Sequence, residues 1–155
     1  MSTSVLFLCT GNSARSQMAE ALLPLIGGKQ FVAYSAGTNP VGVNACTVTV
    51  MAEVGIDISQ NRSKHINEYA DRRFDYVITV CDRAKESCPI FPAAHKMLHW
   101  CFDDPAAAPE REKLETFRRV REEITSAICR FLADEFELSG TVPSSGGLGT
   151  TALRA

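Results

Sequence analysis

A short apolar run followed directly by a loop of small and polar residues constrains this chain most. The run Val5-Leu6-Phe7-Leu8 has no polar member and ends at Cys9, so it predicts a strand buried on both faces. The five residues after Cys9 are Thr-Gly-Asn-Ser-Ala, and Arg15 then opens a stretch with helical spacing. A buried strand, a tight loop and a helix in this order indicate an α/β unit with its functional loop at the strand's carboxyl end.

The loop is suited to holding a tetrahedral oxyanion. Its short side chains let successive backbone N–H groups point into one concavity, which the positive end of the following helix completes. The planar guanidinium of Arg15 is suited to binding two oxygens at once. The N–H groups also favour the thiolate of Cys9, and Ser16 is a candidate donor to its sulfur. We interpret Cys9 as a nucleophile, and the predicted oxyanion-binding residues are Thr10, Gly11, Asn12, Ser13, Ala14 and Arg15.

Strands and helices alternate along the chain. The predicted strands are Ser4–Leu8, Phe31–Ser35, Tyr76–Val80 and a short one around Met97–Trp100. The predicted helices are Ala14–Leu23, the segment from the capping residue Asn44 to Val54, and the periodic run from Leu114 to Leu132. Pro24 is expected to end or kink the first helix, and Gly27-Gly28 to stop it. The alternation predicts a small parallel sheet of about four strands flanked by helices on both faces. Cys9 and Cys81 both occupy strand carboxyl ends, where active groups gather.

Length and composition predict one soluble domain. The 155 residues suggest a single catalytic domain over 1–138, followed by a disordered tail over 139–155 that is rich in Gly, Ser and Thr. A net charge of −2 without a basic stripe argues against nucleic acid, and the apolar runs are too short for a membrane. Six cysteines without a signal peptide indicate reduced thiols in a cytoplasmic protein, which we expect to be a monomer.

Two further cysteines indicate a thiol switch. Cys81 closes a predicted strand, and Cys88 follows seven residues later. If the segment between them is helical, their Cα atoms lie about 10.5 Å apart, whereas a disulfide needs about 4.4–6.8 Å. Bridging them would therefore require this segment to unwind. A zinc site that adds His95, His99 and Cys101 is the alternative, but the ligand spacings fit poorly, and no metal site is predicted.

The stretch from Leu8 to Glu20 resembles the signature of arsenate reductases in the low-molecular-weight protein tyrosine phosphatase superfamily. The resemblance continues through Tyr34–Gly37, Glu53–Ser59 and His99–Pro105 and covers about residues 4–135. It implies a low-molecular-weight tyrosine phosphatase-like fold and the reduction of arsenate to arsenite in arsenic detoxification. Phosphate and sulfate would be competing oxyanions, and no cofactor is expected.

The resemblance also implies a role for each of three cysteines. Cys9 attacks arsenate, Cys81 attacks the sulfur of Cys9 as arsenite leaves, and Cys88 resolves the resulting disulfide. The exposed Cys81–Cys88 disulfide is then reduced from outside, and each exchange is a thiolate attack on sulfur. Thioredoxin is the expected reductant; glutaredoxin with glutathione, or mycothiol, stays open.

A carboxylate after the last predicted strand is a candidate proton donor. In Asp103-Asp104-Pro105 the proline holds the residue before it extended and orders the loop. In the phosphatase and reductase relatives, the aspartate directly before the proline protonates the leaving oxygen. The resemblance therefore implies that Asp104 is the general acid.

Three positions depart from the family pattern. Ala14 stands where many relatives have a second cysteine, so Cys9 has no neighbouring thiol in the loop. Some relatives hold a potassium ion beneath the loop; Asn12, Glu20 and Ser35 match that site, but Lys64 stands at its aspartate position, and its ammonium group would replace the ion. We therefore expect no potassium requirement. Cys101 stands where relatives often have glycine, and it is either an inert strand cysteine or a second resolving thiol.

Two other functions compete with arsenate reduction. A phosphatase acting on phosphotyrosine or small phosphoesters needs only Cys9, Arg15 and Asp104. Such relatives usually have an aromatic residue soon after the Asp-Pro pair, whereas Pro105 is followed here by three alanines. A thiol-based redox sensor or an oxyanion-binding module without turnover is the third possibility. Arsenate turnover that depends on Cys81 would separate the reductase from both.

Overall fold

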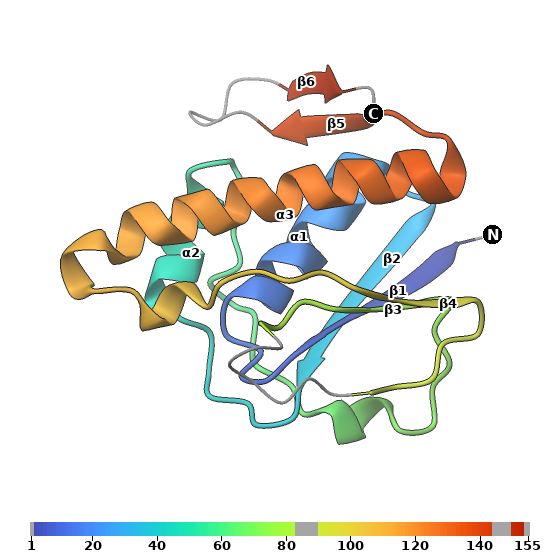
Figure 1. The fold of residues 1–155 in the computed structure, drawn as a ribbon, viewed down its shortest axis with the longest axis horizontal. Helices are drawn as coiled ribbons and strands as arrows, with labels where there is room; N and C mark the ends of the chain where they lie inside the picture. The colour runs from blue at the N-terminus through green and yellow to red at the C-terminus, as the bar shows by residue number, and fades with distance from the viewer. Residues whose placement is uncertain (1, 83–89, 144–149, 154–155) are drawn as a thin grey trace.

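The computed structural model describes residues 2–82, 90–143 and 150–153 (Figure 1). Its centre is a four-stranded sheet in the order β2-β1-β3-β4. The strands are β1 (Thr3–Cys9), β2 (Phe31–Gly37), β3 (Tyr76–Thr79) and β4 (Lys96–His99). All neighbouring pairs are parallel, so the four carboxyl ends lie along one edge of the sheet. The predicted parallel sheet is confirmed.

β1 is an interior strand because its apolar run is buried on both faces. It pairs with β2 on one side and with β3 on the other. Val5 and Phe7 belong to the apolar core beneath the helices, while Leu6 and Leu8 belong to a second apolar cluster on the opposite face. Each buried side chain of this size contributes about 1.5–3 kcal/mol. This burial anchors Cys9 at the end of β1.

Helices cover the two faces of the sheet unequally. The α-helices α1 (Arg15–Gly27), α2 (Ala45–Ala52) and α3 (Lys113–Phe136) lie on one face (Figure 1). On the other face, the described residues contribute the 3-10 helix η1 (Ile66–Tyr69) and loop residues such as Phe74. Two more 3-10 helices, η2 (Pro105–Ala107) and η3 (Glu110–Glu112), lead into α3. Helices therefore stand on both faces, as predicted, but the α-helices described here share one.

The ends of α1 and α2 follow the glycine and asparagine signals. α1 runs through Pro24 and ends at Gly27, and Gly28 follows with a φ of 90°, a left-handed value that glycine adopts at little cost. Leu22, Leu23 and Ile26 are buried, which keeps the last turn of α1 in the core despite the proline. Asn44 caps α2 by accepting a hydrogen bond from the backbone N–H of Cys46 at 2.8 Å.

The segment expected to be a disordered tail differs from that expectation in its described part. β5 (Gly140–Pro143) and β6 (Thr150–Leu153) pair antiparallel in a two-stranded sheet. A side chain at Gly140 would meet Ile26 of α1 at 2.6 Å and Cys129 of α3 at 3.2 Å. Because this glycine has no side chain, β5 lies directly on both helices. The expectation of disorder is corrected for these two strands.

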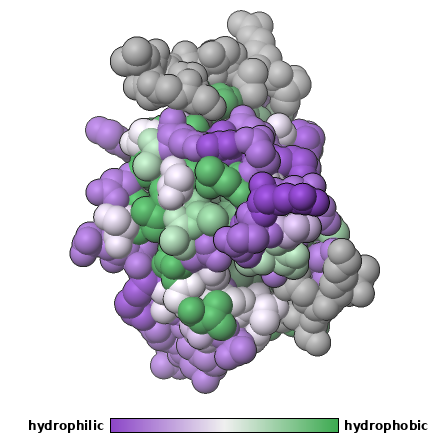
Figure 2. All heavy atoms as spheres, turned by 90° about the vertical axis from the view of Figure 1, so that its left-hand side faces the viewer, coloured by the Kyte–Doolittle hydropathy of each residue, from purple (hydrophilic) through white to green (hydrophobic). Residues whose placement is uncertain are grey.

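The surface of the molecule mixes polar and apolar residues. Figure 2 shows the face at the left of Figure 1, where hydrophilic residues surround a central apolar area. None of the helices in the described residues combines the length and the apolar character that a membrane crossing needs.

An ion-pair cluster joins α2 to α3. Glu53, directly after α2, accepts from Arg118 Nη2 and from Arg121 Nη1, each at 2.8 Å. The Arg121 side chain is buried, and its Nη1 also donates to the carbonyl of Val50 at 2.9 Å. The hydrogen bond from Arg118 is the main cause that lowers the pKa of Glu53 below its ordinary value of 4.5, with Arg121 adding to it against burial.

Replacing this carboxylate should weaken the α2–α3 contact. Glu53→Gln should lower the free energy of unfolding by about 1.5–3 kcal/mol near neutral pH, since hydrogen bonds to a charged group are lost. Because the pKa of Glu53 is lowered in the folded state, this stabilisation is present above 4.5 and is lost as the pH falls through the folded value. Urea unfolding across this pH range measures the effect.

Glu122→Gln is the matched control for this prediction. Glu122 accepts from Arg121 Nε at 2.8 Å, but it does so from the exposed side of the same arginine. The substitution Glu122→Gln should therefore change the free energy of unfolding by less than about 1 kcal/mol. If the loss in free energy of unfolding caused by Glu53→Gln stays constant as the pH falls, the stabilising role of the Glu53 carboxylate is contradicted.

Candidate functional site

The loop between β1 and α1 is held from outside through its carbonyl oxygens. Four successive carbonyls, from Thr10 to Ser13, accept hydrogen bonds from other loops and from α2. Their donors are the backbone N–H groups of Asn39, Val41 and Asn44 at 2.9–3.1 Å, with the hydroxyls of Ser63 at 2.6 Å and Thr47 at 2.8 Å. With the carbonyls turned outward, the N–H groups of the loop are left for its interior, which is the arrangement of an anion nest.

Cys9 lies at the centre of this nest. Its Sγ is 2.8 Å from Ser16 Oγ, and the backbone N–H of Asn12 donates to it at 3.1 Å. The thiol is buried, and α1 begins beside it without a capping side chain, because Ala14 occupies the cap position. The first N–H groups of the helix therefore need a partner that is not a side chain, and an anion supplies one.

A pocket of about 250 Å³ opens above the loop. It is lined by the loop residues together with Asn39, Val41, Asp104 and Ala106. Arg15 lines the same pocket, and its Nη1 donates to the carbonyl of Phe102 at 3.2 Å, which holds the guanidinium over the loop. The predicted nucleophile and the predicted arginine, from one loop, thus meet the predicted acid, which is distant in sequence, in one cavity.

Asp104 is held at the pocket by the start of η2. Its Oδ1 accepts from the backbone N–H of Ala106 at 3.0 Å. The neighbouring Asp103 points elsewhere and pairs with Arg119 of α3 at 3.2 Å. Of the two adjacent aspartates, the one predicted from its place before Pro105 is the one that lines the pocket with Cys9.

Asn12 ties the loop together from within. It has a φ of 48°, in the left-handed region that asparagine enters more readily than most residues. Its side chain donates to Ser16 Oγ at 2.8 Å and accepts from Gln17 Nε2 at 3.0 Å and from the N–H of Lys64 at 2.9 Å. The sequence predicted Asn12 as an oxyanion-binding position and as a match to the potassium site, so its structural role in holding Ser16 was missed.

Three residues outside the loop support it and were also missed as loop contacts. Gly37, at the end of β2, lies against the loop so closely that a Cβ there would be 2.3 Å from the carbonyl oxygen of Thr10. Gln17 donates to Asn12 and to the carbonyl of Arg62 at 3.0 Å. Ser63 binds the Asn12 carbonyl. In the sequence, Gly37 and Gln17 gave a signal only as members of the stretches that carry the family resemblance, and Ser63 gave none.

Lys64 supplies a positive charge beneath the loop. Its Nζ lies 3.4 Å from Glu20 Oε1, which also accepts from Ser35 Oγ at 2.8 Å. Both ends of this ion pair are mostly buried, with side-chain exposures of 13% for Lys64 and 19% for Glu20. The chain's own ammonium group therefore stands beside the carboxylate that the sequence comparison assigned to a cation site.

Cys81 lies beside the strand that carries Cys9. It lies two residues after the end of β3, is fully buried, and its Sγ is 3.9 Å from the carbonyl of Leu8, the residue before Cys9. Cys88 lies outside the described residues. No disulfide joins the described cysteines, which are Cys9, Cys46, Cys81, Cys101 and Cys129.

The residues of the zinc alternative make other contacts. His99 Nδ1 is 2.5 Å from Thr79 Oγ1, and His95 packs edge-on against Tyr76. Within the described ranges, no three side chains among the histidines, cysteines, aspartates and glutamates come together as a metal site. The pocket above Cys9 is lined by Asp104, and the buried thiol of Cys81 lies against the strand that carries Cys9.

Comparisons with known proteins agree with this site. The model of the low molecular weight phosphotyrosine protein phosphatase family matches residues 4–139. Arsenate reductase 2 of Staphylococcus epidermidis is 45% identical over 128 residues, which cover 83% of this chain and 95% of that protein.

Solved structures agree as well. An arsenate reductase in its phosphate-binding state superposes with a TM-score of 0.69 at 30% identity, covering 85% of this chain and 98% of that one. A thioredoxin-dependent arsenate reductase of Corynebacterium glutamicum superposes with a TM-score of 0.66 at 29% identity. The superposition covers 88% of this chain and 62% of that one.

The role of Asn12 can be separated into backbone and side-chain parts. Asn12→Ala should lower the free energy of unfolding by about 2–4 kcal/mol, because it adds left-handed strain and leaves buried partners unpaired. Asn12→Gly should cost less, since glycine removes only the side-chain hydrogen bonds and not the fit to the positive φ. Urea unfolding measures both. Equal stability of Asn12→Ala and wild type would contradict the role.

Proposed function

This chain belongs to the low molecular weight phosphotyrosine protein phosphatase family, and we propose that within this family it is an arsenate reductase. The identity of 45% over 128 residues to arsenate reductase 2 of Staphylococcus epidermidis supports this function. The observation that carries it is the buried thiol of Cys81 beside the strand end that presents Cys9. Hydrolysis of a phosphoester does not need a second thiol, whereas reduction of arsenate by a protein thiol does.

The first step uses the pocket above Cys9. Arsenate occupies the nest with its oxygens on the loop N–H groups and on the Arg15 guanidinium. The thiolate of Cys9 displaces one oxygen from arsenic and forms a sulfur–arsenic bond. Asp104 lines the pocket and donates a proton to the departing oxygen, which leaves as water.

The second step transfers two electrons to arsenic. The thiolate of Cys81 attacks Cys9 Sγ, a sulfur–sulfur bond forms, and the electron pair of the sulfur–arsenic bond moves onto arsenic. Arsenate has then become arsenite, and the two thiols have become one disulfide. Both sulfurs start from buried positions on neighbouring strands, so water is kept from the adduct.

Regeneration needs a thiol donor from outside. We assign the attack on the Cys9–Cys81 disulfide to Cys88, as the family pattern implies, with thioredoxin as the reductant. The thioredoxin-dependent relative of Corynebacterium glutamicum supports that choice. A relay of free thiols requires a reducing compartment, so we propose that the protein works in the cytoplasm, as a monomer and without a bound cofactor.

Phosphoester hydrolysis is a second candidate activity of the same pocket. Cys9, Arg15 and Asp104 line it together, and phosphate matches arsenate in shape and charge. The rim beside Asp104 carries Val41 and Ala106, whereas phosphatase relatives usually have an aromatic residue close after the Asp-Pro pair. We therefore infer a residual hydrolysis of small aryl phosphates.

Removing the second thiol should separate the two activities. Cys81→Ser should abolish arsenite release, because arsenic then stays bound to Cys9, while hydrolysis of an aryl phosphate is largely kept. Arsenite assays with each reductant in turn and a chromogenic phosphate ester measure both activities. Cys46→Ser, a half-buried cysteine on α2, is the matched control and should retain both. Equal loss of both activities in Cys81→Ser would assign Cys81 a folding role instead.

The neighbouring aspartates allow a matched test of the acid. Asp104→Asn should keep the cap on η2, since an amide oxygen also accepts from Ala106, but it should slow aryl phosphate hydrolysis by about 10²–10⁴. Asp103→Asn should have little effect, because Asp103 faces Arg119. Steady-state kcat values across pH provide the measurement. A similar loss in both variants would count against Asp104 as the proton donor.

A further inference from the structure

The ladder of the sheet brings a third described cysteine to the strand edge that carries Cys9 and Cys81. Thr79 of β3 is opposite His99 of β4, and the backbone N–H of Trp100 donates to the carbonyl of Thr79 at 2.7 Å, so the pairing continues past the strand ends. Extended by two residues beyond Thr79 and His99, the same register would place Cys81 next to Cys101. The carboxyl ends of β1, β3 and β4 thus carry one cysteine each.

Side-chain contacts agree with this placement. Cys101 Sγ lies 3.9 Å from Asp82 Oδ1, the carboxylate of the residue after Cys81. Cys81 Sγ lies 3.9 Å from the carbonyl of Leu8, on its other side. Cys81 therefore stands between the strand of Cys9 and the segment of Cys101.

The strand spacing suits a disulfide between Cys81 and Cys101. Adjacent strands lie about 4.8 Å apart, and disulfides need Cα atoms about 4.4–6.8 Å apart. Thr79 and His99 meet across the ladder, with Oγ1 and Nδ1 2.5 Å apart. Past the ladder, both cysteines lie on the side of α3: Cys81 belongs to the core cluster under the helices, and Cys101 lines a pocket with residues of α3. This disulfide needs no unwinding of a helix, whereas a Cys81–Cys88 disulfide would need it if the segment between those two cysteines is helical.

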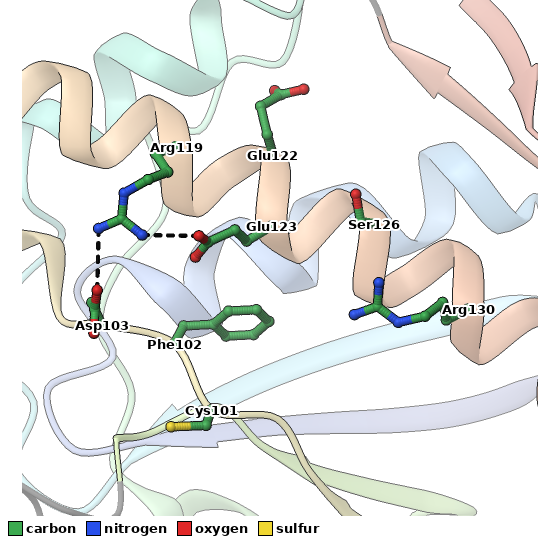
Figure 3. Close-up of a pocket in the computed structure, with 8 residues that line it drawn as sticks. All are labelled: Cys101, Phe102, Asp103, Arg119, Glu122, Glu123, Ser126 and Arg130. Carbon is green, nitrogen blue, oxygen red and sulfur yellow. Dashed lines mark hydrogen bonds and ion pairs between the residues drawn. The ribbon is translucent and has the colours of Figure 1, made fainter.

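Cys101 is also accessible. Its side chain is exposed, whereas Cys9 and Cys81 are buried. It lines an open pocket of about 600 Å³, across from Arg119, Glu123 and Ser126 of α3 (Figure 3). The mostly buried Asp82 carboxylate is within reach to accept the thiol proton. A disulfide that includes Cys101 would present one sulfur to a reductant at the surface.

We propose that Cys101 is a resolving thiol of the relay, an assignment that rests on the proposed arsenate reductase function. The Cys101 thiolate attacks Cys81 Sγ in the Cys9–Cys81 disulfide, and its proton passes to Asp82. A Cys81–Cys101 bond forms as the Cys9–Cys81 bond breaks. Cys9 leaves as a thiolate on the Asn12 N–H and the Ser16 hydroxyl. An external dithiol then reduces the Cys81–Cys101 disulfide, and Cys88 offers a second route to the same release.

The first experiment tests the pair without arsenate. Cys9→Ser/Cys88→Ser protein is equilibrated in glutathione buffers of increasing oxidation, and its disulfides are mapped by mass spectrometry of peptides. We expect an intramolecular Cys81–Cys101 disulfide, which is lost in the triple variant that adds Cys101→Ser and kept in the one that adds Cys46→Ser. If both thiols form only mixed disulfides with glutathione or stay free, the proposal is overturned.

The second experiment places the pair in the reaction. Cys88→Ser protein is given arsenate without reductant, and arsenite and disulfides are measured together. Without reductant, we expect arsenite release together with a Cys81–Cys101 disulfide. With thioredoxin, we expect continued turnover. That turnover should be lost in Cys88→Ser/Cys101→Ser and kept in Cys88→Ser/Cys46→Ser. Arsenite release that stops at a Cys9–Cys81 disulfide overturns the role of Cys101. Absence of arsenite release from wild type overturns the proposed function itself, whatever the first experiment shows.

Discussion

The site depends on hydrogen bonds that the loop after β1 accepts from outside. Four carbonyl oxygens from Thr10 to Ser13 are each bound by another segment. An unsupported loop of this kind would be free to turn its N–H groups toward solvent, because small residues restrict the backbone little. Binding the carbonyls outside leaves the N–H groups inside, and the buried strand β1 holds the nest and Cys9 in a fixed relation.

The parallel sheet adds the second requirement, which is a thiol near the first. A parallel arrangement places all strand carboxyl ends at one edge, and the order β2-β1-β3-β4 makes the ends of β1 and β3 neighbours. Cys9 and Cys81 are distant in sequence but close at this edge for that reason. In the proposed function, the nest serves hydrolysis and reduction alike, and the cysteine after the neighbouring strand adds the redox step.

Local patterns predicted much of the fold and of the site. These patterns depend only on neighbours in sequence: the apolar run before Cys9, the apolar spacing of three and four residues in α3, and the Asn44 cap. The structure has the corresponding elements at nearly the predicted places. Cys9, Arg15 and Asp104 were predicted and meet in one pocket. The strands near the C-terminus were not predicted, because the segment is rich in Gly, Ser and Pro and because β5 packs on α1 and α3 through tertiary contacts at Gly140 and Val142.

By itself, the sequence determined the chemistry of this protein: a thiolate in an anion-binding loop, an arginine, an aspartate before a proline and more cysteines than hydrolysis needs. Only the tertiary structure decided which groups meet. It showed that Asn12 and Gly37 shape the loop, that Asp104 and not Asp103 lines the pocket with Cys9, and that Cys101 contacts Asp82, the residue after Cys81. The reason is physical: residue type sets what a group can do, whereas strand order and register set the distances over which thiols and charges act.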